Sequence, residues 1–324
     1  MKSGFIYSDD NKRYHTHNYY LRHKYGKKVF KVPINLNLSC PNRDGKKGFG
    51  GCTFCSGMLS GDFAGNPNES IREQFDAVRQ ELHKKWQDAL YIPYFQAGSN
   101  TYGDIDFLRE AFFSAAMFEN AVGVNVATRA DCISDECADM LLELSKVTNL
   151  EVELGLQTVS DVTAKRINRC HTFEEFLDGY NKLKSRGLDI CVHIINGLPG
   201  ESREDMLKTA GEVARLHPHS IKIHLLHVIK GTKMCDEFLN GEFNEMTLEE
   251  YTQTVCDQLE ILPPDVVIER VTGDGKKETL VSPLWSLKKF CVMNEIDKTM
   301  AKRNTFQGAK YNLSADVPPP PPLR

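Results

Sequence analysis

A series of short β-branched runs about 30 residues apart constrains the fold of this chain most strongly. The runs cover residues 91–97, 122–128, 151–157, 190–196 and 221–228, and their starts are 31, 29, 39 and 31 residues apart. One parallel βαβ unit takes roughly 30 residues. With a first strand expected within 29–38, the pattern predicts an α/β fold of six βα units in an open or closed barrel. The working face of such a barrel lies at the carboxyl ends of its strands.

The segments around these runs predict helices and a different C-terminal region. Ile71, Phe75, Val78, Leu82 and Trp86 form one apolar stripe at helical spacing. Beyond Gly231 the pattern predicts a helix over 247–262, a strand over 266–271 and a helix over 284–300, which together suggest a small α+β extension. The proline run 318–322 predicts an extended, disordered end.

Ten cysteines stand out in a composition that is otherwise ordinary for 324 residues. The polar start of the chain is unlike an export signal, and no apolar run approaches the roughly 18 residues of a membrane span. We therefore expect a cytoplasmic chain that makes no membrane contact, in which the cysteines are not a disulfide framework.

The net charge of −4 conceals an uneven distribution of charge. Residues 1–47 hold eleven Lys/Arg against three Asp/Glu, a net of +8, and residues 281–324 hold seven against three, a net of +4; the middle therefore carries −16. Five of the eleven tyrosines lie in the first 25 residues. Basic, aromatic flanks on an acidic body suggest a surface for a polyanion.

Three cysteines have a spacing that indicates chemistry. Cys40, Cys52 and Cys55 form a C-x11-C-x2-C pattern, and the glycines between them let the backbone wrap around a compact object. Three thiolates suit a [4Fe–4S] cluster with one open iron, which S-adenosylmethionine (SAM) can chelate before it is cleaved to a 5′-deoxyadenosyl radical. The alternatives are a structural zinc site, although zinc sites usually have four ligands, or unrelated buried thiols. We expect the other seven cysteines to be packing residues.

The chain resembles radical SAM proteins of the YhcC/YtqA type, relatives of the radical SAM domain in the catalytic subunit of Elongator. The likeness extends from about residue 14 to residue 311. Its motifs are KVPIN (31–35), CPNRDGKKGFGGCTFC (40–55), YFQAGSNTY (94–102), VATRADC (126–132), VELGLQT (152–158), KRINRCH (165–171), INGLPGE (195–201), LLHVIKGT (225–232), ERVTGD (269–274), PLWSLKKFCVMN (283–294) and TFQGAKY (305–311).

The resemblance implies a partial TIM-type (βα)6 radical SAM barrel with a small C-terminal α+β extension. We assign residues 1–28 to a basic, tyrosine-rich arm and residues 29–232 to the barrel. Residues 233–312 form the extension, and residues 313–324 a disordered proline-rich tail.

The resemblance also implies roles for individual residues. Cys40, Cys52 and Cys55 would ligate the cluster, and Phe54 would lie against the adenine, the alternative being a packing role in the loop. The other cofactor-binding candidates follow strand ends and are Gln96, Gly98, Ser99, Thr101, Arg129, Glu153, Gln157, Gly197 and Gly200.

Some of these candidates have competing interpretations. The segment 96–101 stands where many relatives hold the SAM amino group with an acidic residue, which is absent here. Glu153 is expected to meet ribose hydroxyls or else to lie on an exposed face. Arg129 is expected to clamp the methionine carboxylate or a substrate phosphate, or else to form a surface salt bridge. His193 and His227, on late strands, are candidate proton donors or satisfied core histidines.

The basic N-terminus suits RNA, or is a solvated charged arm, and the RNA-binding candidates are Tyr19, Tyr20, Arg22, Lys24, Lys27 and Lys28. The resemblance implies tRNA as substrate, specifically conversion of wobble 5-carboxymethylaminomethyl-uridine towards 5-aminomethyl-uridine. It also implies flavodoxin or ferredoxin as the electron donor and a tRNA methyltransferase acting next. The alternatives are a radical SAM enzyme for a protein or small molecule, and a non-catalytic protein that binds zinc and RNA.

Overall fold

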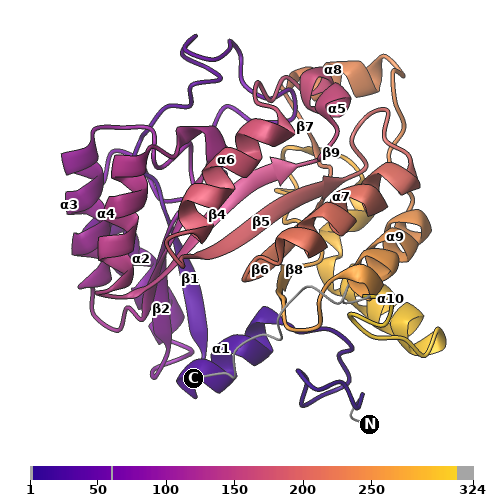
Figure 1. Cartoon of the computed structure of the whole chain (residues 1–324), viewed down its shortest axis with the longest axis horizontal. Coiled ribbons are helices and arrows are strands. Elements are labelled where there is room, and N and C mark those ends of the chain that lie inside the picture. The colour runs from indigo at the N-terminus through magenta and orange to yellow at the C-terminus, as the bar shows by residue number, and fades with distance from the viewer. Residues whose placement is uncertain (1–2, 60, 312–324) are drawn as a thin grey trace.

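A seven-stranded parallel sheet, curled into a partial barrel, forms the centre of the computed structural model, which describes residues 3–59 and 61–311 (Figure 1). Neighbouring strands are parallel throughout, in the order β1-β2-β3-β4-β5-β6-β8. The strands are β1 (Val29–Ile34), β2 (Leu90–Phe95), β3 (Gly123–Thr128), β4 (Asn149–Gln157), β5 (Asp189–Asn196), β6 (Ser220–Leu225) and β8 (Val267–Arg270). The α/β barrel predicted from the strand spacing is confirmed.

Helices cover the outer face of the sheet. They are α2 (Ile71–His83), α3 (Ile105–Ala116), α4 (Asp135–Ser145), α6 (Phe173–Lys184) and α7 (Arg203–Leu216). The 3₁₀ turn η1 (Ala130–Cys132) follows β3, and the short helix α5 (Asp161–Arg166) follows β4 and lies beside α8 (Lys233–Leu239) (Figure 1). Ser70 and Glu73 form a capping box at the start of α2, and Phe75 in the predicted stripe is fully buried. Trp86 lies beyond the end of α2 and is exposed, so the stripe is shorter than predicted.

The C-terminal region departs from the prediction of a separate extension. Its strand β8 pairs in parallel with β6, so it is the seventh strand of the main sheet. Val267 and Ile268 explain the pairing, because both are buried in the core. The remaining elements are β7 (Val228–Ile229), α8 (Lys233–Leu239), α9 (Leu248–Ile261), β9 (Leu280–Ser282), the 3₁₀ turn η2 (Leu284–Leu287) and α10 (Lys289–Lys302). The helix predicted over 284–300 is thus divided into η2 and α10.

The N-terminal segment is part of the barrel and not a free arm. Helix α1 (His17–Tyr25) is capped by Thr16, which also bridges to Ile268 of β8. The Tyr25 hydroxyl donates to the carbonyl of Val122, just before β3, over 3.1 Å. Helix α1 therefore closes the amino ends of the strands, and Figure 1 shows it opposite the end that carries the long loop after β1. The predicted proline-rich tail lies outside the described residues.

Alternation along β4 explains why the barrel is polar inside. Val152 and Leu154 are fully buried towards the helices, whereas Glu153 and Gln157 line the interior pocket. Side chains two apart share a face of a strand, so Glu151 points inward with Glu153. Among the described helices, none has the length and apolar character needed to cross a membrane.

Candidate active site

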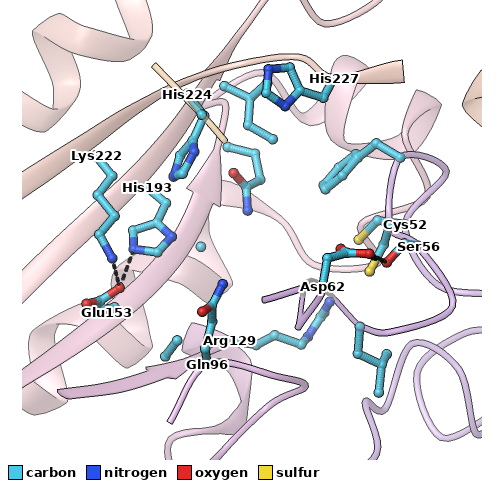
Figure 2. Close-up of a pocket in the computed structure, with 18 of the residues that line it drawn as sticks. Cys52, Ser56, Asp62, Gln96, Arg129, Glu153, His193, Lys222, His224 and His227 are labelled. Atoms are coloured by element: carbon cyan, nitrogen blue, oxygen red, sulfur yellow. Dashed lines mark hydrogen bonds and ion pairs between the residues drawn. The ribbon is translucent and has the colours of Figure 1, made fainter. Parts of the chain in front are cut away.

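A pocket of about 330 Å³ opens at the carboxyl ends of the strands. One wall is the cysteine loop, defined as residues 35–70 between β1 and α2, and the facing wall comes from the ends of β5, β6 and β8 (Figure 2). The predicted site residues that line it are Cys40, Cys52, Phe54, Cys55, Gln96, Gly98, Ser99, Arg129, Glu153, Gln157, His193 and His227. Residues up to 187 positions apart in sequence thus share one site at the end predicted from the topology, since 227 − 40 = 187.

Local turns bring the three cysteines to the same wall. The amide of Arg43 donates to the carbonyl of Cys40 over 2.8 Å, and the amide of Cys55 donates to that of Cys52 over 3.0 Å. The fully buried Asn42 holds the two turns together, because its carbonyl accepts from Gly51 and its side-chain amide lies 3.6 Å from the Cys52 sulfur. The segment that holds the three cysteines therefore folds into a single cradle.

The three sulfurs are not close enough together for a single zinc ion. Zn–S bonds of about 2.3 Å in a tetrahedron place sulfurs about 3.8 Å apart. In the described residues, the three-residue group whose donor atoms all come within 4.8 Å of one another is Glu151, Cys191 and Glu269, and not the three cysteines. Burial, with Cys55 and Cys40 nearby, raises the pKa of Cys52 to about 12. Three neighbouring thiols suit a large cationic iron core that stabilises them as thiolates.

Two buried guanidinium groups stand beside this cradle. Arg129, at the end of β3, forms a bidentate pair with Asp131, with both N–O distances 2.9 Å. Arg169 is only 2 % exposed; its terminal nitrogens donate to the carbonyls of Thr158 and His171, and its Nε has no partner in the described structure. Burial lowers the pKa of Arg169 to about 10, so it stays cationic at neutral pH. Arg129 thus forms a salt bridge, and because it also lines the pocket, the clamping of a carboxylate or phosphate stays a prediction.

Arg169 and His171 were not predicted as site residues. Both line the pocket, and His171 Nε2 is also buried without a partner in the described residues. They lie in the KRINRCH motif beyond the short helix α5, where no strand end marks them. The signal available in sequence was the motif itself, which places Arg169 and His171 in the connection between the Gln157 strand and helix α6.

The segment after β2 is held against the cysteine loop by its backbone. Gly98 has φ +78°, and a Cβ there would lie 2.7 Å from the carbonyl oxygen of Leu38. Its amide donates to Leu59 over 3.0 Å, and the amide of Ser99 donates to Ser39 over 3.3 Å. Glycine is therefore required at position 98. Gln96, Gly98 and Ser99 line the pocket beside the cysteine loop, as predicted.

Three predicted cofactor residues do not line the pocket. The Thr101 hydroxyl is 2.6 Å from that of Thr128 and donates to the carbonyl of Cys132, so it ties two loops together. Gly197 follows β5, where its amide lies 3.3 Å from the Met206 sulfur. Gly200 has φ +86° and turns the chain towards α7. Thr101, Gly197 and Gly200 therefore stay outside the lining of the pocket, although Leu198 of the loop after β5 shares an apolar cluster with Phe54.

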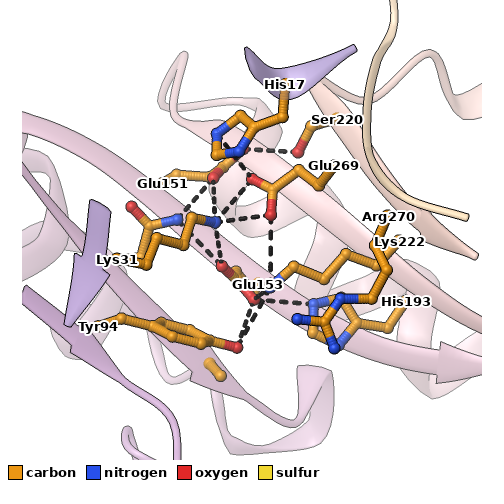
Figure 3. Close-up of polar contacts among 12 residues, drawn as sticks. His17, Lys31, Tyr94, Glu151, Glu153, His193, Ser220, Lys222, Glu269 and Arg270 are labelled. Atoms are coloured by element: carbon orange, nitrogen blue, oxygen red, sulfur yellow. Dashed lines mark hydrogen bonds and ion pairs between the residues drawn. The ribbon is translucent and has the colours of Figure 1, made fainter. Parts of the chain in front are cut away.

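Glu153 is the centre of a buried ionic network and not a free ribose ligand (Figure 3). One carboxylate oxygen accepts from Lys31 over 2.8 Å and from Asn125 over 3.0 Å. The other accepts from Tyr94 over 2.7 Å, from His193 over 2.9 Å and from Lys222. A carboxylate offers about four lone-pair sites. Five donors leave none for ribose, which corrects the predicted role.

The network continues to the closed end of the barrel. Lys31 Nζ lies 2.6 Å from Glu269 and 3.5 Å from Glu151, and His17 of α1 lies 3.6 Å from Glu269. Burial and the neighbouring Glu269 raise the pKa of Glu151 to about 8. Burial opposes the ionisation of Glu153, but Lys222 and Lys31 outweigh it and hold the pKa of Glu153 well below its usual range. The interior therefore contains mutually neutralising charges.

The wall opposite the cysteines carries three imidazoles and one guanidinium. His193, His224, His227 and Arg270 all line the pocket. Burial lowers the pKa of His227 to about 4 and lowers those of His193 and His224, so the rings are neutral at pH 7. His227 Nε2 is buried without a partner in the described residues. Arg270, which was not predicted, lies only 3.4 Å from its one ion-pair partner in the described structure, Asp274.

The residues predicted to bind RNA lie at the other end of the molecule. Tyr19, Tyr20, Arg22 and Lys24 are on α1, and Lys27 and Lys28 follow it directly, below the first residues of the strands. Nine-residue β4 spans the barrel, which puts the amino ends of the strands roughly 26 Å from the carboxyl ends that face the cysteine loop, at about 3.3 Å per residue. The structure therefore does not bring these residues to the cysteines.

A curled parallel sheet with a three-cysteine loop at its carboxyl edge defines a class of radical enzyme, and the comparisons place the chain in it. Residues 40–213 match the model of the radical SAM superfamily and residues 218–302 that of the Radical_SAM C-terminal domain. YtqA of Bacillus subtilis is 48% identical over 94% of both chains. The tRNA uridine(34) acetyltransferase of Methanocaldococcus infernus is 29% identical over 156 residues, 47% of this chain and 29% of that protein. The structure of Elp3 from the same archaeon covers 87% of this chain and 64% of that one, at a TM-score of 0.65 and 20% identity.

The chain belongs to the radical SAM superfamily, in its YhcC/YtqA-type group. Its cofactors are a [4Fe–4S] cluster and SAM. The residues present fit them: three thiols in one cradle, small residues at 98 and 99 that leave backbone groups accessible, and the buried cations Arg129 and Arg169 for a carboxylate. When bound, these cofactors supply a 5′-deoxyadenosyl radical that abstracts a hydrogen atom from a substrate.

Proposed function

We propose that this enzyme modifies the wobble uridine of tRNA, converting 5-carboxymethylaminomethyl-uridine towards 5-aminomethyl-uridine. The observation that carries the proposal is the two-walled pocket, whose cysteine wall and histidine wall provide for two ligands side by side. The likeness of half the chain to an enzyme named for tRNA uridine 34 supports the choice of substrate. An anticodon loop can present an unpaired, splayed base to such a pocket.

The cysteine wall would hold the cofactor. Thiolates at Cys40, Cys52 and Cys55 would ligate the cluster, and the guanidiniums of Arg129 and Arg169 would face the methionine carboxylate. Phe54 would lie against the adenine. The backbone at Gly98 and Ser99, anchored on the cysteine loop, would receive the amino group.

The histidine wall would hold the substrate. Arg270 is the one guanidinium on this side and would pair with the carboxylate of the 5-substituent. His224 and His227, both neutral, would hydrogen-bond to uncharged groups of the base. This side of the pocket therefore matches a substrate that has one anionic group and a hydrogen-bonding ring.

His193 is placed to take the proton that the reaction releases. Glu153 is ionised and can only accept, so His193 donates through Nε2 and keeps Nδ1 as an acceptor. In the proposed reaction the carbon beside the carboxylate would lose one hydrogen atom to the 5′-deoxyadenosyl radical that the bound cofactors supply, which gives 5′-deoxyadenosine. The substrate would then lose one electron, for which the cluster would be the acceptor, and one proton, which would go to His193. Water releases the carboxymethyl group from the resulting imine as glyoxylate, which leaves the aminomethyl nucleoside.

The electron donor and the next enzyme follow from this chemistry. Reductive SAM cleavage needs a low-potential one-electron donor, for which flavodoxin or ferredoxin is proposed. The free amine produced would be a substrate for a tRNA methyltransferase.

The test is anaerobic reconstitution with iron, sulfide, SAM and dithionite, with bulk tRNA from a strain that lacks this gene. We expect 5′-deoxyadenosine and glyoxylate to form in equal amounts and 5-aminomethyl-uridine to appear in the digested tRNA. The matched control is Cys40→Ala, which should form neither product. SAM cleavage that tRNA does not change, together with an unchanged wobble nucleoside in the deletion strain, would overturn the tRNA assignment.

A further inference from the structure

The mouth of the pocket has a basic margin on the C-terminal side. We define the basic rim as Arg270, Lys276, Lys277, Lys288 and Lys289, on the loop between β8 and β9 and on the segment that leads into α10. Gly273 and Asp274 of this loop line the pocket, and Lys289 Nζ lies 2.8 Å from Asp274. The basic rim therefore borders the opening through which a substrate enters.

The charge of the basic rim is largely uncompensated. Residues 270–290 hold five Lys/Arg against two acidic residues, Asp274 and Glu278, so 5 − 2 gives a net of +3 where the acidic middle meets the basic C-terminal flank. Arg270 and Lys289 share Asp274. For Lys276, Lys277 and Lys288, no carboxylate within 4.0 Å is found in the described residues. Three ammonium groups without a carboxylate partner make this segment complementary to a polyanion, and Lys276 reaches the mouth of the pocket at Phe63.

Exposed apolar side chains lie beside these cations. Phe290, next to Lys289, is 79% exposed, and Leu284 is 62% exposed. Across the mouth, Phe63 of the cysteine loop lines the pocket, and Lys276 Nζ lies 5.2 Å from the centre of its ring. Cations interleaved with exposed aromatic rings are the surface that single-stranded nucleic acid uses, phosphates on the former and bases on the latter.

The floor of the barrel also has basic residues beside aromatic rings, but it lies at the amino ends of the strands, away from the cysteines. Tyr20 packs on His219, Lys24 lies 5.4 Å from the Tyr20 ring, and Tyr25 is hydrogen-bonded to Val122. The ionic network around Lys31 fills the interior above α1. A base bound at the floor cannot reach the cysteines through that interior.

We propose that the basic rim is the docking surface for the RNA substrate, which rests on the proposed function. Phosphates bind Lys276, Lys277 and Lys288, an unstacked base lies on Phe290, and the reacting base enters between Phe63 and the loop at Asp274. The helix α1 is not an RNA-binding element.

The test compares two triple variants of equal charge change on the reconstituted full chain. The rim triple is Lys276→Glu, Lys277→Glu and Lys288→Glu, and the matched floor triple is Arg22→Glu, Lys24→Glu and Lys27→Glu. Binding of bulk tRNA is measured by fluorescence anisotropy between roughly 50 and 200 mM salt, and RNA-independent 5′-deoxyadenosine formation reports cofactor chemistry.

We expect the rim triple to bind tRNA at least about 10-fold more weakly than wild type. We also expect the slope of log affinity against log salt to decrease in magnitude by about 2 to 3. The floor triple should match wild type, and both should keep RNA-independent SAM cleavage. Phe290→Ala should weaken binding about 5-fold or more by loss of stacking, whereas the control Phe107→Ala on α3 should not.

Other outcomes overturn the inference in distinguishable ways. If the rim triple binds tRNA as tightly as wild type, or if the floor triple is weakened equally, the basic rim is not the docking surface, and the proposed function is unaffected. No tRNA binding by the wild-type chain overturns both. If the rim triple loses RNA-independent SAM cleavage, tRNA binding is measured instead on the corresponding Lys→Gln triple. Wild-type affinity in that variant shows that the basic rim is not the docking surface.

Discussion

The two ends of this barrel use charged residues in opposite ways. At the closed end Lys31 and Lys222 neutralise Glu153 and Glu269 within a few ångströms, and Glu151 beside them keeps its proton at neutral pH because its pKa is raised to about 8 (Figure 3). At the open end, polar atoms such as Arg169 Nε and His227 Nε2 are buried without a partner in the described residues. A buried polar group without a partner costs free energy. The difference teaches that the closed end is built for stability and the open end for ligands.

The largest effect is expected from the cysteine wall. Cys52→Ala removes one ligand of the cluster, and we expect SAM cleavage to fall by at least about 10³-fold, as expected when the group that supplies the radical is lost. The measurements are bound iron and sulfide and the yield of 5′-deoxyadenosine. Cys291→Ala, an exposed cysteine on α10, is the control and should behave as wild type. Full activity of Cys52→Ala would show that the open end is not organised around the cluster.

The second prediction tests the closed end. Glu153→Gln leaves Lys31 and Lys222 partly uncompensated, and removing one partner of a buried ionic network costs about 3 to 5 kcal/mol. The free energy of unfolding in urea measures this cost. Adding Lys222→Met should recover part of the loss, because it removes an unpaired charge. A decrease below about 1 kcal/mol would mean that the network contributes little to stability.

The third prediction concerns pH at the same end. Glu151 has a folded pKa raised to about 8, so the folded state holds a proton that the unfolded state releases above about pH 4.3. Stability therefore falls as pH rises from about 4.3 to 8. Glu151→Gln removes this dependence, and its free energy of unfolding should exceed that of wild type by about 1 to 3 kcal/mol at pH 8.5 but little at pH 5. If the two proteins differ in unfolding free energy by the same amount at both pH values, the raised pKa of Glu151 is wrong.

The smallest effect is expected on α1. Tyr25→Phe removes the hydrogen bond to Val122 and should cost about 1 kcal/mol of unfolding free energy. Affinity for tRNA and SAM cleavage should not change. A loss of tRNA affinity without a loss of stability would indicate that the floor, and not the mouth, meets the RNA.

Much of the open end could be predicted from the sequence because its signals are local. Cys40, Cys52 and Cys55 lie on one loop, so their spacing alone indicates a shared cradle. Gln96, Arg129 and Gln157 stand at or just beyond the ends of predicted strands, which a parallel sheet places at one edge. Arg169 and Arg270 were missed because each depends on a turn or a strand pairing that has no sequence period.

The sequence by itself determined the βα alternation, the cysteine loop and the end of the barrel where chemistry occurs, since each depends on spacing within about 30 residues. Only the tertiary structure decided which charges are paired and which end α1 covers. Lys31 and Glu269, 238 residues apart, meet only because the sheet curls and β8 joins it. The resulting burial made Glu153 a structural anion and turned a basic helix that suits RNA into the floor of the barrel.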